Sequence, residues 1–316
     1  MFEGKEYVYE VYKTGSFSKA AEKLYITQPS LSAMVKKVEK KLGAPIFDRS
    51  TSPPGLTQCG ERYIRCVERL MDMENEFGNY LNDLEGLRAG HLAIGGSNLF
   101  TSYILPPILQ RFMKDYPGVE VNLVESNTKQ LERQLLSGSL DLVIDNYLFS
   151  ESIYERKKFS AEHLLLAVPR PMLAGKEEAL AGAMLDAAGV RAGRHLPETW
   201  PAVDLGWFEE EPFLLLKPGN DTRERSETLL AEAGIRHPRI LLDLDQQMTA
   251  YHLACYGMGI AFVTDTLIRN VPSDSRIVFF CPKGSVNQRN IYFYYKRSRY
   301  MTRAMETFLN QYGTGR

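Results

Sequence analysis

The residues from Thr27 to Gly43 most constrain what this chain can fold into. Apolar side chains recur there every three or four positions, on one stripe of an α-helix: Leu31, Val35, Val38 and Leu42. The opposite face is small or basic: Pro29, Ala33, Lys36, Lys37 and Lys40. Thr27 is a good N-cap and Gly43 a good left-handed stop, so both helix ends are marked.

A second short helix is expected just before this one, over residues 18–24, with Ala20 and Ala21 on its buried side. Only residues 25–27 join the two helices. Two helices joined by a short turn, with the later helix basic, form the helix-turn-helix pattern. Taken alone, the later helix could also be a solvated amphipathic helix with its lysines facing water.

The flanking residues predict the rest of a small winged domain. A first helix over residues 3–13 would turn three side chains inward: Val8, Val11 and Tyr12. After Gly43, the turn at residues 53–55 predicts a short β-hairpin. Arg49 lies on this hairpin, where it could reach a phosphate or a minor groove.

Length and charge indicate more than one domain with different partners. A chain of 316 residues can hold two or more domains. The net charge is −1, but residues 34–41 are strongly basic and the charges of residues 204–211 are all acidic. A basic patch on a nearly neutral chain favours a polyanion-binding end attached to another domain.

The compartment is predicted from what the sequence lacks. Four cysteines form no CxxC pair, so reduced thiols are expected: Cys59, Cys66, Cys255 and Cys281. The first residues resemble no signal peptide, and no run approaches the roughly 18 apolar residues of a membrane helix. We therefore expect a cytoplasmic protein without a membrane partner.

A long helix is expected from residue 58 to residue 88. Four apolar residues recur there every seven positions: Tyr63, Leu70, Phe77 and Leu84. Val67 and Leu81 lie on a matching second seam, where Glu74 and Arg88 interrupt the apolar pattern. Such a seam predicts a coiled coil with a partner helix and hence a dimer. The alternative is one long helix that packs on its own domain.

From His91 onward, strands and helices alternate. Residues 91–145 read as three strands separated by two helices, and residues 213–264 repeat this order. Such alternation predicts parallel sheets of the α/β class. Later strands are expected at 276–281 and 291–297, and residues 174–212 follow no regular pattern.

In this order of elements the chain resembles the LysR-type transcriptional regulators. The motif that carries the resemblance is FSKAAEKLYITQPSLSAMVKKVEKKLGAPIFDRSTSPPGLTQCG. The resemblance implies a transcription factor with no enzymatic activity, a two-lobed effector-binding domain like a periplasmic binding protein, and dimers that assemble into tetramers. RNA polymerase and a dyad-symmetric promoter site would be further partners.

The resemblance also implies domain boundaries. Residues 1–58 would form the winged helix-turn-helix domain, residues 59–90 the linker helix and residues 91–316 the effector-binding domain. The first lobe would combine residues 91–166 with 266–316, and the second would hold residues 167–265.

Carried onto this sequence, the resemblance implies a set of DNA-contacting residues. They are Ser18, Thr27, Gln28, Pro29, Ser30, Ser32, Ala33, Lys36, Lys37 and Arg49. Gln28 and the serines can bond base edges or phosphates, whereas the cations mainly supply phosphate contacts. Ala33 and Met34 stand where many members carry longer polar residues, so an apolar contact with a thymine methyl is expected there.

Short polar residues cluster at the expected strand ends, where ligands of parallel sheets bind. The effector-binding candidates are Ser97, Asn98, Thr101, Ser126, Asn127, Asp145, Asn146, Asn220, Thr222 and Thr264. Each is also a good N-cap, which is the structural alternative. Asp145 would oppose a carboxylate unless Arg156 or Lys157 pairs with it, so an effector with a hydroxyl or an amine also fits.

The main alternatives are an enzyme and a cytosolic solute-binding or scaffold protein built on the α/β region. No complete GxSxG, dinucleotide-binding or P-loop motif occurs. Five histidines are scattered without ligand spacing, so neither a cofactor nor a metal is expected. Salt-sensitive binding to duplex DNA would distinguish a regulator from these alternatives.

Overall fold

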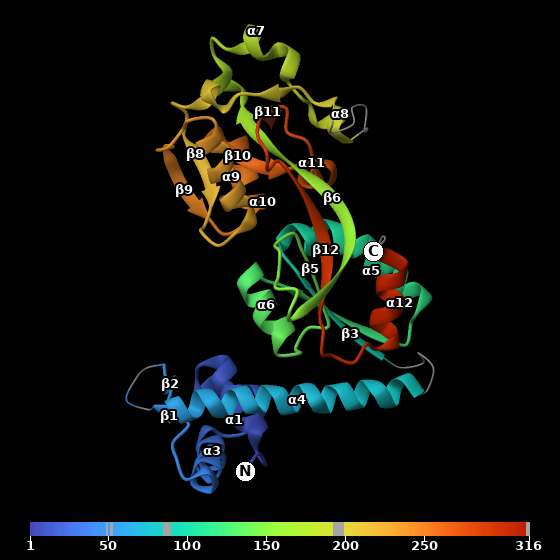
Figure 1. The fold of residues 1–316 in the computed structure, drawn as a ribbon. Coiled ribbons are helices and arrows are strands. Elements are labelled where there is room, and N and C mark those ends of the chain that lie inside the picture. Colours follow the sequence, from blue (N-terminus) through green and yellow to red (C-terminus); the bar gives the residue numbers. More distant parts are fainter. Residues whose placement is uncertain (49, 51–52, 85–89, 192–198, 314–316) are drawn as a thin grey trace. The chain divides into compact units, whose positions relative to one another are not determined.

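The structure is a computed structural model, and it describes residues 1–48, 50, 53–84, 90–191 and 199–313 (Figure 1). The chain divides into two compact units, Met1–Gly78 and Asn79–Arg316. Parts of the predictions above lie outside the described residues: Arg49, the side chain of Leu84, and residues 85–88 of the expected long helix.

The first unit contains the helix-turn-helix. Its helices are α1 (Lys5–Thr14), α2 (Phe17–Lys23) and α3 (Gln28–Leu42). α3 begins as predicted, because the Thr27 hydroxyl accepts a hydrogen bond from the Ser30 amide. It ends at Gly43, whose φ of 80° is left-handed and whose amide donates to the Glu39 carbonyl. Both predicted ends of the helix are therefore confirmed.

A two-stranded antiparallel hairpin of β1 (Phe47–Asp48) and β2 (Gly55–Leu56) forms the predicted wing. Glu39 anchors it to α3, because its carboxylate accepts hydrogen bonds from the amides of Ile46 (2.9 Å) and Phe47 (3.2 Å). Gly60 permits the close approach of the next helix, since a Cβ there would lie 2.0 Å from the Ile46 carbonyl oxygen.

The core of this unit is apolar and lies between the helices. Its helical members include Val8, Val11, Ala20, Ala21, Leu31, Val35 and Val38. Tyr12, which we expected to face inward, is 43% exposed. Its ring lies at the edge of the α1 stripe against Tyr9, with the ring centroids 6.0 Å apart.

The long helix α4 (Gln58–Leu84) packs partly on its own unit, which was the alternative to a coiled-coil seam. Tyr63 and Val67 are 4% and 0% exposed in the core of the first unit, so they do not form the expected seam. Further along, Phe77 and Leu81 are 62% and 47% exposed. Only the later part of the helix leaves an apolar stripe at its surface.

The second unit has two α/β lobes. The first lobe contains β3 (Gly90–Gly96), α5 (Leu105–Asp115), β4 (Val119–Glu125), α6 (Thr128–Leu136) and β5 (Leu142–Asp145). β3 pairs in parallel with both β4 and β5, which confirms the predicted βαβαβ order. The helix expected from Thr101 starts with a π-helical turn, Phe100–Ile104, before α5.

The second lobe repeats this arrangement. It contains β8 (Phe213–Leu216), α9 (Asp221–Glu232), β9 (Ile240–Leu244), α10 (Gln247–Cys255) and β10 (Ile260–Thr264). β8 lies between β9 and β10 and is parallel to both. The carboxyl ends of the strands therefore gather at one edge in each lobe.

Two strands, β6 (Tyr154–Pro169) and β12 (Gln288–Lys296), connect the lobes. β6 pairs with β12 over residues 154–163 and with β10 and β11 over residues 164–169. Figure 1 shows β6 continuing from one lobe into the other. The C-terminal helix α12 (Arg303–Tyr312) covers the first lobe, where Phe308 packs in the core.

The sheets divide the lobes differently from the expected boundary at residue 266. α11 (Asp265–Asn270) and β11 (Ile277–Pro282) belong with the second lobe rather than the first. β11 pairs with β6 and with β7 (Ala202–Val203), and Leu267 shares a core with Leu214. Along the chain, β11 is thus an extra strand of the second lobe that precedes β12, and β12 returns to the first lobe.

Short helices occupy the region that follows no regular pattern in the sequence. They are Arg170–Leu173, α7 (Glu177–Leu180), Ala181–Ala183, α8 (Ala187–Arg191) and Leu205–Phe208. Trp200 is buried against the second lobe, whereas Trp207 is 45% exposed.

Candidate functional site

The start of α3 presents the predicted DNA-contacting residues to the solvent. Eight of them are exposed: Ser18, Thr27, Gln28, Pro29, Ser30, Ala33, Lys36 and Lys37. Ser32 is half-buried, and Arg49 is outside the described residues. The Thr27 and Ser30 hydroxyls lie 2.9 Å apart, and the Gln28 amide donates to Ser32 at 3.4 Å. The helix start is thus a connected set of polar groups.

The lysines of α3 differ in their surroundings. Lys41 pairs with Glu3, and this bond, together with the charges of Lys41 and Lys37, lowers the pKa of the Glu3 carboxyl. Lys36 takes part in no ion pair with a described residue. Lys36 is therefore available to a partner outside the unit.

Tyr25 is a surface residue that sequence reasoning missed. It lies in the turn between α2 and α3, is 96% exposed and has a φ of 56°. A left-handed conformation costs a residue with a side chain about 1–2 kcal/mol, and glycine is the usual occupant. Because tyrosine is not a residue that indicates a left-handed backbone, the sequence could not predict this conformation at residue 25. Its hydroxyl is able to donate to a phosphate.

A pocket of the second unit lies where the strand ends of its two lobes meet. Its empty space, counted together with the open solvent at its mouth, is about 470 Å³. Its polar lining is Ser97, Thr128, Asp145, Asn146, Asn220, Thr222, Asp245, Gln246, Gln247 and Arg289. Its apolar lining is Leu99, Phe100, Leu216 and Met248. The pocket therefore offers hydrogen-bonding groups on an apolar base.

Five of the predicted effector residues line this pocket: Ser97, Asp145, Asn146, Asn220 and Thr222. The other five lie elsewhere. Asn98 and Thr101 both donate to Glu125, at 3.0 and 3.1 Å. Asn127 accepts from a backbone amide as the N-cap of α6, and Thr264 does so as the N-cap of α11. Ser126 follows β4 without lining the pocket.

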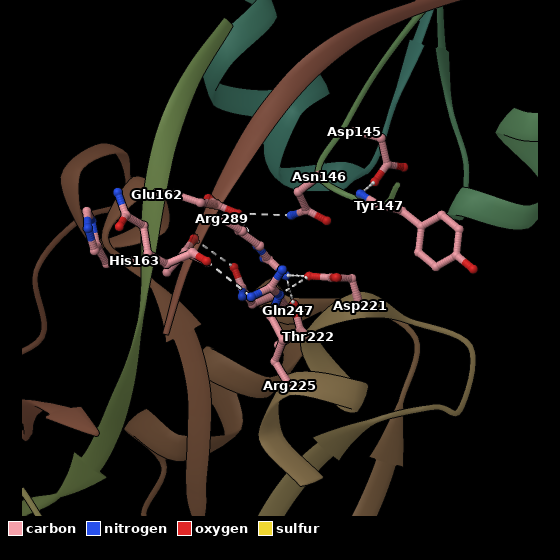
Figure 2. A network of polar contacts seen from close by, with 12 residues as sticks. Asp145, Asn146, Tyr147, Glu162, His163, Asp221, Thr222, Arg225, Gln247 and Arg289 are labelled. Carbon is pink, nitrogen blue, oxygen red and sulfur yellow. Dashed lines mark hydrogen bonds and ion pairs between the residues drawn. The ribbon is translucent and has the colours of Figure 1, made fainter. Parts of the chain in front are cut away.

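Arg289 is the centre of a buried polar network beside the pocket (Figure 2). Its Nε donates to Glu162 at 2.7 Å, and its Nη1 donates to Asp221 and, at 3.0 Å, to Thr222. Asn146 donates to the same Glu162 oxygen at 2.9 Å. Arg289 and Glu162 come from the two connecting strands, so the network joins these strands to the start of α9.

Asp145 is the buried carboxylate of the pocket, with 3% of its surface exposed. It accepts hydrogen bonds from the Thr128 hydroxyl (3.0 Å) and the Tyr147 amide (2.9 Å). Burial raises its pKa from 3.8 to about 6, against the lowering effect of these bonds and of the Arg289 charge. The cation near Asp145 is therefore Arg289, not the expected Arg156 or Lys157.

Arg156 and Lys157 lie in other surroundings. Arg156 donates to Glu151 and covers the ring of Tyr292, 4.7 Å from its centroid. Lys157 donates to Asn310 on α12 at 3.0 Å. Both residues are on β6, and β12 lies between this strand and β5, which ends at Asp145.

The remaining pocket residues show what the sequence could and could not reveal. Asp245, Gln246 and Gln247 directly follow β9, so the strand-end rule applied to residues 239–244 would have found them. Arg289 stands at the start of an antiparallel strand that returns from the other lobe. No local pattern places such a residue near the strand ends.

The described residues contain no group of three His, Cys, Asp or Glu side chains able to hold a metal ion. No helix in the described part of the chain is long and apolar enough to cross a membrane.

A winged helix-turn-helix with a polar and basic outer face, in one chain with a two-lobed pocket, defines a ligand-responsive DNA-binding regulator. A model of bacterial regulatory helix-turn-helix proteins of the lysR family matches residues 4–61. The LysR substrate binding domain matches residues 85–188 and 190–314. The chain belongs to the LysR family of transcriptional regulators, with a DNA-binding domain and an effector-binding domain.

Known proteins resemble the chain over nearly its whole length. It is 29% identical to the uncharacterized HTH-type transcriptional regulator YcgK of Bacillus subtilis (strain 168), over 96% of this chain and 91% of that protein. It is 26% identical to a probable RuBisCO transcriptional regulator of Guillardia theta, over 93% of this chain and 89% of that protein. These relatives are regulators, and the family is one of regulators rather than enzymes, which excludes the enzyme alternative.

Solved structures show the same fold. Full-length CbnR complexed with its target DNA superposes with a TM-score of 0.65 at 18% identity, covering 99% of this chain and 98% of that chain. A full-length OxyR variant from Pseudomonas aeruginosa superposes with a TM-score of 0.66 at 20% identity, covering 100% of this chain and 98% of that chain.

Proposed function

We propose that the effector of this regulator binds in the pocket between the lobes of the second unit. The observation that carries the proposal is that side chains of both lobes line one pocket. Asp145 follows a strand of the first lobe, whereas Asn220 and Thr222 stand at the start of a helix of the second. A ligand that contacts both lobes stabilises one arrangement of the lobes over others.

In this proposal the exposed start of α3 reads the DNA. Gln28, Ser30 and Ser32 contact base edges or phosphates, while Lys36, Lys37 and Arg49 contact phosphates. Tyr25 joins them as a phosphate contact from the turn. Binding to chromosomal DNA would place the protein in the cytoplasm.

Dimerisation is proposed to use the exposed stripe of α4. Met73, Phe77 and Leu81 are 63%, 62% and 47% exposed and follow one another at intervals of four residues on one helix face. A second copy of α4 would cover them. A dimer would place two recognition helices about 34 Å apart on a dyad-symmetric site. Tetramers and contact with RNA polymerase would follow on the promoter.

Effector binding is proposed to change the DNA complex through α4. The helix belongs to both units, since it runs from Gln58 to Leu84 across the division at Gly78. A change in lobe closure would alter the spacing of the two DNA-binding domains and the bending of the site.

The test is binding of the full chain to DNA from upstream of its own gene, at two salt concentrations, with a shuffled competitor. We expect selective binding that weakens steeply with salt, because several phosphates are neutralised. Lys36→Ala should reduce the salt slope, with Glu177→Ala on the second unit as the control. Absence of binding to any duplex at low salt would refute the proposed DNA-contacting surface.

A further inference from the structure

We propose that the pocket binds a small zwitterion of the amino-acid type, with its ammonium group at Asp145 and its carboxylate at the start of α10. The inference rests on the effector site proposed above and specifies the class of its ligand. Three observations support it: an unpaired buried carboxylate, the pairing of the other charges, and a helix start with free donors.

The first observation is the position of Asp145. Its side chain lines the pocket although only 3% of its surface is exposed. Three hydrogen-bond donors satisfy part of its acceptor capacity: the Thr128 hydroxyl and the amides of Tyr147 and Asn146. A carboxylate has about four acceptor positions, so it can still accept from a ligand. An ammonium group would supply both the hydrogen bond and the missing opposite charge.

The second observation is that Asp145 carries the unbalanced charge of this region. Arg289 and Asp245 line the pocket with it and belong to two of three ion pairs with N···O distances of 2.7 Å: Glu162–Arg289, Asp221–Arg225 and Asp245–Lys217. Asp221 is shared between Arg225 and Arg289. These six residues balance one another, whereas Asp145 has no ion pair with a described residue. A ligand that carries only negative charge would therefore meet an excess of negative charge.

The third observation is the start of α10. Gln246, Gln247 and Met248 line the pocket, and the N-cap position, Gln246, makes no side-chain capping hydrogen bond. The first amides of a helix need acceptors from outside it, and the helix dipole favours a negative group there. α6 and α9 differ, since Asn127 and Asn220 cap them with side-chain oxygens.

Gln247 adds a side-chain donor at the same place. Its Oε1 accepts a hydrogen bond from Thr264 at 3.2 Å, while its buried Nε2 has no hydrogen-bond partner among the described residues. An unsatisfied buried donor costs about 1–3 kcal/mol, so a ligand acceptor at this point is favoured. A carboxylate could accept from Nε2 and from the first amides of α10 together.

The two ends of the ligand would therefore contact different lobes. Asp145 ends β5 of the first lobe, and α10 belongs to the second lobe. Loss of either charged group from the ligand would remove its contact with one lobe. Both groups are thus needed for tight binding and for bringing the lobes together.

The experiment is calorimetric titration of the full chain with each of the twenty protein amino acids. The best binder is then compared with its decarboxylated amine and its deaminated acid. We expect at least one amino acid to bind, and each truncated counterpart to bind more than tenfold more weakly. Asp145→Asn should weaken amino-acid binding at least tenfold, and Gln247→Leu should weaken it by a smaller factor.

Asp243→Asn is the matched control, because this carboxylate lies on β9 outside the pocket lining and pairs with Arg223. It should change the affinity less than twofold. Absence of binding by all twenty amino acids, equal binding of the deaminated acid, or an unchanged affinity of Asp145→Asn would overturn the proposal. Binding of a dicarboxylate or a sugar that Gln247→Leu abolishes would overturn the ligand class and leave the effector site intact.

Discussion

The outer face of α3 and the pocket of the second unit use charged side chains in opposite ways. Lys36 and Lys37 are exposed to water, whereas Arg289 and Glu162 are 6% and 0% exposed and bond directly. Exposed charges act on distant partners and are screened by salt, while a buried pair is costly to break. The first surface can therefore change without affecting folding, and the second cannot.

The largest effect is expected for Arg289→Met. It leaves the buried Glu162 carboxylate without its cation, and removing one partner of a buried pair costs about 3–5 kcal/mol. Urea unfolding of the variant, followed by the signal of the second unit, measures the change. The double variant Glu162→Gln/Arg289→Met should recover part of the loss. Equal stability of the single variant and the wild type would show that the network does not support the fold.

Gly60→Ala should destabilise the first unit by about 3 kcal/mol through overpacking rather than charge. The new Cβ would lie 2.0 Å from the Ile46 carbonyl oxygen, which is backbone and cannot move aside easily. Gly78→Ala is the control, because a Cβ there meets nothing within 4 Å. The thermal unfolding transitions of the two variants give the comparison, and a similar transition temperature would contradict the packing at Gly60.

Asp145→Asn should stabilise the unliganded protein above pH 6, by up to about 3 kcal/mol if the whole pKa shift is recovered. Burial raises the pKa of Asp145 from 3.8 to about 6, so the folded state holds this proton more tightly than the unfolded state. Its contribution to stability therefore falls as the pH rises from about 4 to about 6 and then stays constant. Denaturant unfolding at pH 4 and pH 8 should show the variant's advantage only at pH 8.

Lys36→Ala should have the smallest effect on folding, within about 0.5 kcal/mol, because Lys36 is exposed. Its effect should appear in DNA binding, as a decrease of about one in the slope of log affinity against log salt. Lys41→Ala is a useful counterpart, since Lys41 pairs with Glu3. A larger loss of DNA affinity for Lys41→Ala than for Lys36→Ala would contradict the assigned surface.

Much of the first unit follows from local sequence rules. Thr27 and Gly43 mark the ends of α3 by capping chemistry, and the apolar spacing correctly predicts the burial of Leu31, Val35 and Val38. The heptad pattern of α4 was less decisive. The same apolar spacing serves a dimer seam and an intramolecular core, so it could not show that Tyr63 and Val67 are buried within their own unit.

The pocket was predictable only in part. Asp145 ends β5 and Asn220 caps the helix that comes after β8, and strand ends of parallel sheets meet at one edge. Arg289 reaches the pocket through an antiparallel strand that crosses between lobes, and its pairing with Glu162 depends on register over a long separation in sequence. The assignment of β11 to the second lobe depends on the same crossing, which no local pattern encodes.

The most direct test of the account is whether ligand binding in the pocket changes the DNA complex. The measurement is the DNase footprint of the full chain on its own upstream DNA, with and without the small-molecule fraction of an extract of the source cells. We predict that the fraction alters the footprint of the wild type and leaves that of Asp145→Asn unchanged. The same alteration in both proteins, or none in the wild type, would contradict the account.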